Sequence, residues 1–318
     1  MRNYLLRRSA QAVLVLWAAY TVSFAVLHVL PGDPVTIMAA GGGDAGAVTP
    51  RQIAVLRAQY GLDRSLPEQY ADGLGHALRG DFGSSVQTGE PVARMIADAL
   101  PATLQLTAGA LLLALPLGAG VALLGTYTRR RWLRQLLLSL PSAGVSAPTF
   151  WVGLTLVQVV SFHWGLLPAF GNEGIGSLVL PSVTLALPAA GLVAQVFAKS
   201  LRTALDEPYV QTALAKGAGR ARVHFAHAAR NALAPPLTVA GVLVGSVLAG
   251  SVVVESVFSR TGIGRTTATA VTTQDIPVVQ GLVVFGACAF VLANLVVDVV
   301  HALLDPRIAT GSRPVVAS

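Results

Sequence analysis

Charged side chains are scarce in this chain. Asp, Glu, Lys and Arg make up 12% of its 318 residues, whereas 53% are hydrophobic. An ordinary soluble domain carries roughly 25% charged residues. A water-soluble fold of this length could not cover its core with so few charges. The mean hydropathy of +0.64 agrees, and lipid is therefore the expected solvent.

Cysteine and lysine are almost missing, and each shortage excludes one kind of chemistry. Cys288 is the only cysteine, so no disulfide forms within the chain and a buried small apolar role is expected. The only lysines, Lys199 and Lys216, both follow alanine. A phosphate-binding P-loop needs Gly-Lys followed by Ser or Thr. The chain therefore lacks this motif for ATP hydrolysis, and no catalytic residue is assigned to it.

Long intervals without any charge give the number of membrane spans. Each is long enough for a span of about 20 residues, and lipid forces such backbone to satisfy itself as a helix. The first is too long for the core of a cleaved signal peptide, which has about 7–15 residues. The predicted fold is all-α, a polytopic membrane protein with six transmembrane helices. The intervals are 9–32, 99–128, 135–172, 174–198, 231–254 and 276–297.

The basic residues predict the orientation. With both termini in the cytoplasm, fifteen of the 22 Lys and Arg residues lie on the inner face, as the positive-inside rule requires. The net charge of +7 then needs no nucleic acid to explain it. These fifteen are Arg2, Arg7, Arg8, Arg129, Arg130, Arg131, Arg134, Lys199, Arg202, Lys216, Arg220, Arg222, Arg230, Arg307 and Arg313.

The chain divides around these spans. The expected parts are 1–32 (N-terminus and first helix), 33–98 (external subdomain), 99–305 (transmembrane core, helices two to six, with the inner loop 201–230) and 306–318 (cytoplasmic tail). Within the external subdomain, helices are predicted at 50–61 and from Pro67 to Leu78. A second outer segment, 256–277, is rich in Gly and Thr. Its Thr261-Gly262-Ile263-Gly264 predicts a tight or re-entrant turn.

The inner loop 201–230 is unusually long for a connection between spans. Asp206 is a good helix N-cap, with Glu207-Pro208 in the first turn. Gly217 suits the position just past a helix end, after Lys216. A second helix is predicted from Arg220 to Leu233. Two short helices, bent near Gly217, are thus expected at the inner membrane surface, with one face of the first lined by Val210, Ala213 and Leu214.

Two interpretations of this bent pair stay open on the residues alone. An amphipathic element resting among lipid headgroups would use Arg220, Arg222 and Arg230. A docking element for a cytoplasmic partner would use its small residues, which let a cleft close around the backbone. Those small residues are Ala213, Ala215, Gly217, Ala218 and Gly219.

A family resemblance favours docking. Residues Glu207–Ala218 resemble the cytoplasmic signature loop of ABC importer permeases, which reads Glu-Ala-Ala, three residues, then Gly. Here Gln211-Thr212-Ala213 and Gly217 occupy those places. The following His227–Leu233 resembles the dipeptide/oligopeptide/nickel subfamily. The long external segment resembles that of the first permease of the pair.

The resemblance extends over nearly the whole chain. One departure is Arg260-Thr261, where relatives often carry Trp-Pro, and another is Gln211 in place of Glu. The matching segments are Tyr4–Arg8, Leu30–Pro34, Ser65–Tyr70, Leu78–Gly83, Leu100–Leu104, Glu255–Phe258, Ile276–Gly281 and Leu303–Arg307.

The resemblance implies a transmembrane permease subunit of a binding-protein-dependent ABC importer in the bacterial cytoplasmic membrane. Its partners would be a second homologous permease, two cytoplasmic ATPases that hold ATP and Mg²⁺, an external substrate-binding protein and membrane lipid. Peptide is the leading substrate; nickel, a metal chelate, glutathione or another small solute are alternatives, and an exporter is a further one. Glu255 is a candidate pore-mouth residue. Contact with the ATPase is expected from Asp206, Glu207, Tyr209, Val210, Ala213, Lys216, Gly217 and Ala218.

Two enzyme-like or metal-like patterns compete with this interpretation. Ser146 with His301 would suit an intramembrane serine protease, although small-residue helix packing at Ser142, Gly144 and Ser146 explains the pattern better. His224 and His227 share one helix face, but two histidines without a third ligand make a poor metal site. They are expected as solvated residues or contacts to the ATPase. Asp298 is expected to make a structural hydrogen bond in the last span.

Overall fold

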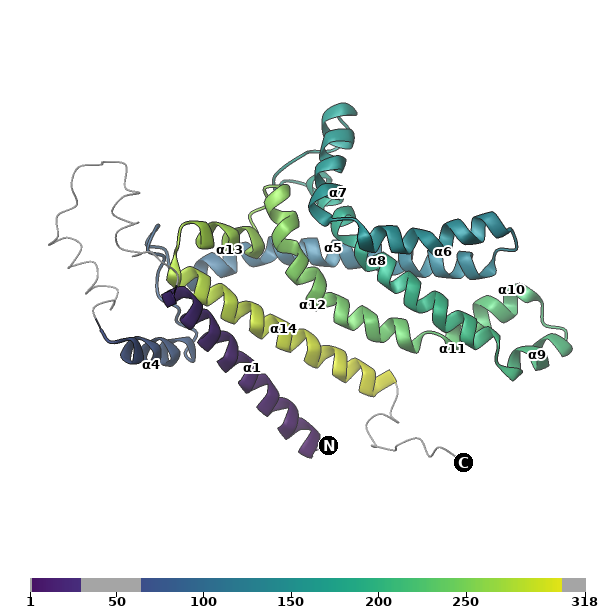
Figure 1. Ribbon diagram of the computed structural model, residues 1–318, viewed down its shortest axis with the longest axis horizontal. Coiled ribbons are helices and arrows are strands. Elements are labelled where there is room, and N and C mark those ends of the chain that lie inside the picture. The colour runs from purple at the N-terminus through teal and green to yellow at the C-terminus, as the bar shows by residue number, and fades with distance from the viewer. Residues whose placement is uncertain (1, 30–63, 305–318) are drawn as a thin grey trace. The chain divides into compact units, whose positions relative to one another are not determined.

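The computed structural model describes residues 2–29 and 64–304. The predicted helix 50–61 and the tail 306–318 lie outside these residues, as do the side chains of Asp298 and His301. All the regular elements of the described ranges are helices, which confirms the predicted all-α class. Helix labels are those of Figure 1.

The chain forms two compact units. The first comprises Met1–Pro101 with Gly262–Leu292, and the second comprises Ala102–Thr261 with Ala293–Ser318. Within residues 2–29 and 64–304, five single helices are long and apolar enough to cross a membrane, and a bent pair makes a sixth crossing if it counts as one. Those five are α1 (Arg2–Val29), α5 (Val92–Tyr127), α8 (Gly176–Leu205), α12 (Ala234–Val257) and α14 (Ile276–Leu304).

The first unit joins α1 to α4 (Leu66–Ala77), the helix predicted from Pro67 to Leu78. Ser65 and Glu68 form a capping box at its start, which fixes the residue at which the helix begins. Tyr20 of α1 and Tyr70 of α4 meet edge to face, with ring centroids 5.5 Å apart. The short helix is thereby held against the first span.

The predicted turn after Thr261 is wrong in part, because residues Ile263–Thr272 form a ten-residue helix, α13. Gly262 is its N-cap and is extended, with φ −111° and ψ −179°. The hydroxyls of Thr266 and Thr267 donate to carbonyls four residues back. Threonines that satisfy themselves within a helix in this way do not end it, and the richness in Gly and Thr gave a misleading loop signal.

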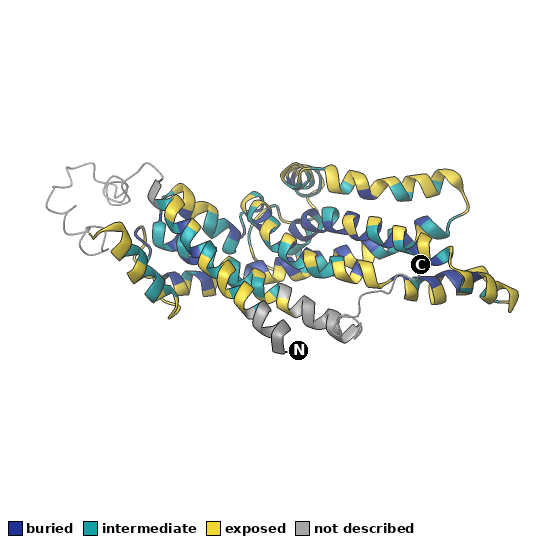
Figure 2. Cartoon of the chain, turned by 60° about the horizontal axis from the view of Figure 1, so that its bottom comes forward, coloured by how far each residue is buried: buried dark blue, intermediate teal, exposed yellow. Residues whose placement is uncertain are grey.

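The second unit is arranged around α8, which packs against α6 (Arg131–Ser146) on one flank and α12 on the other. Buried residues gather where the helices face each other, while the outer faces stay exposed (Figure 2). Gly191 of α8 approaches Pro141 of α6 so closely that an added Cβ would lie 2.6 Å from the Pro141 carbonyl oxygen. The two helix backbones therefore nearly touch at this crossing.

The third predicted span, 135–172, is not one straight helix. It consists of α6, then α7 (Thr149–Leu156) continued by the π-helical η1 (Val157–His163), and the two parts are bent by 101°. Ala147 and Pro148 at the break are extended, with ψ 126° and 127°. A residue before proline avoids the α-helical conformation, which is why the chain turns here. Elsewhere Cys288 is half-buried rather than buried.

Candidate functional site

The bent element between α8 and α12 begins with α9 (Pro208–Ala215). The predicted N-cap is off by one residue. Asp206 instead caps the C-terminus of α8, and Glu207 is the extended N-cap of α9, with ψ 146°. Pro208 takes the first helical position, where its missing N–H is harmless. The proline fixed this boundary because the residue before it must be extended.

Gly217 ends α9 as predicted. Its φ of +85° lies in the left-handed region, which favours glycine. The Gly217 N–H donates to the Leu214 carbonyl at 2.9 Å, and the Ala218 N–H donates to the Ala213 carbonyl at 3.1 Å. These two bonds form a Schellman motif. The turn thus satisfies the carbonyls of the helix end from within the chain.

The α9 helix leaves most of its surface uncovered. Val210 is buried and Ala213 is half-buried, but Leu214, predicted on the same face, is 50% exposed. Tyr209 is half-buried and its hydroxyl has no hydrogen-bond partner. The remaining predicted contact residues are Asp206, Glu207, Lys216 and Gly217, which are exposed, and Ala218, which is half-buried.

The second limb, predicted at Arg220–Leu233, is helical from Arg220 to Asn231, as α10 (Arg220–Arg222), the π-helical η2 (Val223–Ala228) and α11 (Ala229–Asn231). It is packed down firmly. Ala228 and Ala232 are buried against α8 in one apolar cluster, and the Ser200 hydroxyl donates to the Ala232 carbonyl at 3.0 Å. The π-helical turn was not anticipated, because it has no periodicity signal of its own.

His224 and Tyr127 fasten this limb to the end of α5. His224 Nε2 lies 3.2 Å from the Leu123 carbonyl oxygen and 3.3 Å from the Thr126 hydroxyl. The Arg220 guanidinium donates to the Tyr127 carbonyl and stacks over its ring, 4.7 Å from the centroid. Sequence reasoning missed Tyr127. The feature that could have identified Tyr127 is its position as an aromatic residue at the boundary between an apolar run and the basic Arg129–Arg131.

The expectation of solvated histidines fails for His224, which is 3% exposed, whereas His227 is exposed. Burial lowers the pKa of His224 from its ordinary value of 6.5. The hydrogen bond to the Leu123 carbonyl acts in the opposite direction and raises the pKa, while the positive charge of Arg220 lowers it. Burial therefore favours the neutral imidazole over the charged one. No group of three metal-ligating side chains occurs among the described residues.

Glu255, the candidate pore-mouth residue, is fully buried within the second unit. The Thr103 hydroxyl donates to its carboxylate at 2.6 Å. Arg260, also buried, donates to the carbonyls of Gly171 and Ser177, each at 3.2 Å. Burial lowers the pKa of Arg260, and the nearby charge of Glu255 raises it. The two side chains form part of a buried polar network; a pore-mouth role for Glu255 stays a prediction.

Ser146, the candidate nucleophile, is an exposed residue at the end of α6. Of the small residues expected in a helix contact, only Gly144 faces another helix closely, its added Cβ lying 3.2 Å from the Leu187 carbonyl of α8. Ser142 is exposed. The packing explanation therefore holds for Gly144.

Comparisons with known proteins cover nearly the whole chain. Residues 114–310 match the family described as binding-protein-dependent transport system inner membrane component, and residues 1–107 match the N-terminal region of such membrane components. The chain is 36% identical over 308 residues to the glutathione transport system permease protein GsiC of Salmonella typhimurium, covering 97% of this chain and 99% of that protein. It is 35% identical, over the same shares, to the protein of that name from Escherichia coli K12.

Two solved structures share the fold. One is an amino acid ABC transporter with histidines, with a TM-score of 0.51 and 18% identity, covering 67% of this chain and 94% of that one. The other is an inward-facing form of the methionine ABC transporter MetNI, with a TM-score of 0.53 and 16% identity, covering 66% and 96%.

Proposed function

This chain belongs to the family of binding-protein-dependent transport system inner membrane components, and from that premise we propose that it moves small peptides such as glutathione across the inner membrane. It is a permease subunit of an ABC importer. The substrate proposal is supported by its 36% identity to a permease named for glutathione transport. Nothing favours the protease or nickel alternatives over it.

The proposed assembly pairs this chain with a second, homologous permease, with both termini of each in the cytoplasm. The external subdomain 33–98 and the segment 256–277 would meet the substrate-binding protein. Two ATPases, which hold ATP and Mg²⁺, would each grip one inner loop. In this chain that loop is 206–219, with Asp206, Glu207, Tyr209, Val210, Ala213, Lys216, Gly217 and Ala218 at the contact.

The observation that carries this proposal is the contrast between the two limbs of the loop. The first limb, α9, is exposed along most of its surface, while the second is fastened to α5 and α8. Since α9 packs on η2, a push on α9 is passed to the membrane helices rather than absorbed. ATP drives transport in this way only if the ATPases bind the two states of the permease with different affinity.

Site-specific crosslinking tests the contact. In a Cys288→Ser background, Leu214→Cys places a reactive thiol on the exposed side of α9. Ile175→Cys, 84% exposed and just before the other end of α8, is the matched control. In the purified complex, a maleimide photo-crosslinker attached at residue 214 should form a covalent link to an ATPase. The same reagent attached at residue 175 should form no such link. Equal crosslinking of both, or none at 214, would refute the docking assignment.

Uptake experiments test the substrate. Proteoliposomes that contain the whole transporter and its binding protein should accumulate labelled glutathione or dipeptides when ATP is supplied on the side of the membrane that corresponds to the cytoplasm. Accumulation of nickel, with no uptake of any peptide, would overturn the substrate proposal and leave the family assignment intact.

A further inference from the structure

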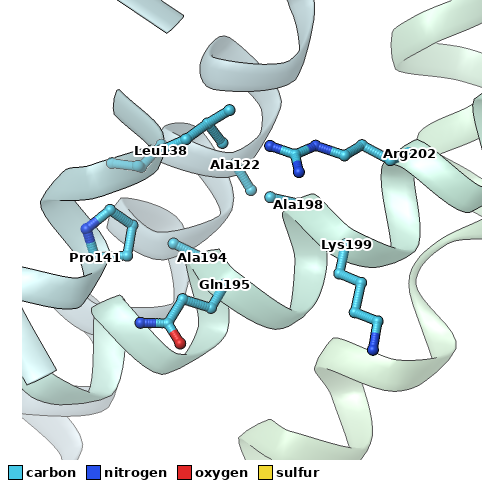
Figure 3. Close-up of a pocket in the computed structure, with 9 residues that line it drawn as sticks. Ala122, Leu138, Pro141, Ala194, Gln195, Ala198, Lys199 and Arg202 are labelled. Carbon is cyan, nitrogen blue, oxygen red and sulfur yellow. The ribbon is translucent and has the colours of Figure 1, made fainter. Parts of the chain in front are cut away.

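A small cavity opens between α5, α6 and α8 in the second unit, outside the loop just described. Its volume is about 150 Å³. Ala122, Ala194, Ala198 and Pro141, all buried, form its apolar floor, and Lys199 and Arg202 stand at its rim (Figure 3). The close crossing of Gly191 and Pro141 lies beside it, since Pro141 is also a lining residue. The cavity is therefore lined by apolar side chains and the polar Gln195, with a basic mouth.

No acidic side chain of residues 2–29 or 64–304 forms an ion pair with the positive charge at this mouth. Figure 3 shows the Arg202 guanidinium extended toward Ala122 and Leu138, while the Lys199 side chain points away. Within the described residues neither side chain makes an ion pair, not even Arg202 with Asp206 one turn further on. Between Asp98 and Asp206, Glu173 is the single acidic residue. The exposed Arg202 is therefore available to pair with a ligand of negative charge.

The cavity adjoins a surface suited to lipid. Along α6, Leu136 and Leu140 are each 49% exposed, and Trp132 near its start is 63% exposed. An exposed tryptophan beside Arg129–Arg131 is typical of the membrane–water interface. An acyl chain can thus lie along α6 while a headgroup reaches the mouth of the cavity.

We propose that this cavity binds the phosphate headgroup of an anionic phospholipid of the inner leaflet, held chiefly by Arg202. The inference rests on the proposed orientation, which puts this end of α8 in the cytoplasmic half of the membrane. A guanidinium matches phosphate geometry through paired N–H donors, and basic pockets between membrane helices on the cytoplasmic side hold such headgroups. The volume accommodates about five waters at roughly 30 Å³ each, which suits a phosphate and falls short of the ~300–1,000 Å³ of sites for larger solutes.

The bound lipid would bridge α6 to α5 and α8, the two helices that hold the second limb of the inner loop. Ala122, Ala198 and the limb residue Ala228 belong to one buried cluster. A headgroup seated there ties α6 to α8 on the side from which the limb is held. Anionic lipid should therefore stiffen the path between α9 and the membrane helices.

The test uses the assembled transporter in nanodiscs of phosphatidylcholine that contain a photoactivatable phosphatidylglycerol. Labelled peptides are mapped by mass spectrometry. Wild-type complex should be labelled on α6 and α8 around the cavity, and Arg202→Gln should reduce that labelling about tenfold, the loss expected for one charge-assisted contact. Arg134→Gln, which removes the same charge from an exposed α6 residue outside the cavity, should leave it unchanged.

The controls separate a seated headgroup from other sources of the signal. Arg202 is exposed, so its variant should assemble, and Arg202→Lys should retain part of the labelling because the charge remains. Equal losses in Arg134→Gln and Arg202→Gln would mean diffuse attraction and would overturn the proposal. Displacement of the label by inorganic phosphate or by reduced glutathione would make this a site for a soluble anion and would also overturn it. Recovery of ATPases in the same preparation reports separately on the proposed function.

Discussion

Gly217 allows the coupling proposal to be tested quantitatively. Its φ of +85° costs a residue with a Cβ about 1–2 kcal/mol. An added Cβ would meet no atom of this chain within 4 Å, so backbone strain is the whole effect within the subunit. Gly217→Ala should therefore shift the Schellman turn roughly 5- to 30-fold toward a frayed helix end.

The assay is the ratio of solute uptake to ATP hydrolysis in proteoliposomes. Gly217→Ala should lower this ratio, and Gly217→Asn should lower it less because asparagine tolerates left-handed backbone. Gly219→Ala is the matched control. Gly219 has φ −64°, and an added Cβ there meets no described atom within 4 Å, so Gly219→Ala adds a methyl group without backbone strain and the ratio should fall less than in Gly217→Ala.

A bulky residue at the same position separates strain from obstruction. Gly217→Phe carries the same backbone strain as Gly217→Ala, so any further loss of coupling arises from a body outside this chain. We expect a substantially larger loss, with ATP hydrolysis continuing, because the side chain would enter the cleft of the ATPase. Wild-type coupling in both the Ala and Phe variants would refute the reasoning.

Three further predictions concern the packing that supports the site. The folded chain holds the pKa of His224 below 6.5, so the unfolded state binds more protons below that pH. Stability should therefore fall as the pH drops below about 6.5. Thermal unfolding measured from pH 8 to 5 should show this fall, and His224→Asn should weaken the pH dependence. Arg260→Ala should destabilise the chain by about 1–3 kcal/mol, since it removes the donor to the Gly171 and Ser177 carbonyls and the positive charge near buried Glu255. The double variant Glu255→Gln with Arg260→Met should recover part of the loss in the same unfolding measurement, and no recovery would show that the two charges are independent. Gly191→Ala should cost about 1–3 kcal/mol because its Cβ meets the Pro141 carbonyl at 2.6 Å, whereas Gly120→Ala, which meets nothing within 4 Å, should be harmless in the isolated subunit.

The sequence by itself determined the membrane class, the approximate positions of the spans and the end of α9. The solvent explains the first two: in lipid, a long run without charge has no alternative to helix. The left-handed turn at Gly217 followed because few other residues adopt that conformation. Pro208 marked a boundary for a similar steric reason, although the N-cap was placed at Asp206 when Glu207 holds it.

Only the tertiary structure decided which polar residues are buried and what they touch. His224 was expected in solvent, yet it lies against Leu123, about a hundred residues earlier. Glu255 and Thr103 meet although they lie 152 residues apart, and the cavity at Arg202 is lined by residues of three helices next to a close crossing at Gly191. Periodicity cannot show such contacts in spans that are apolar on every side. Which helix faces pack together depends on the shapes of small residues such as Gly191, and those shapes affect the structure only once the helices are in contact.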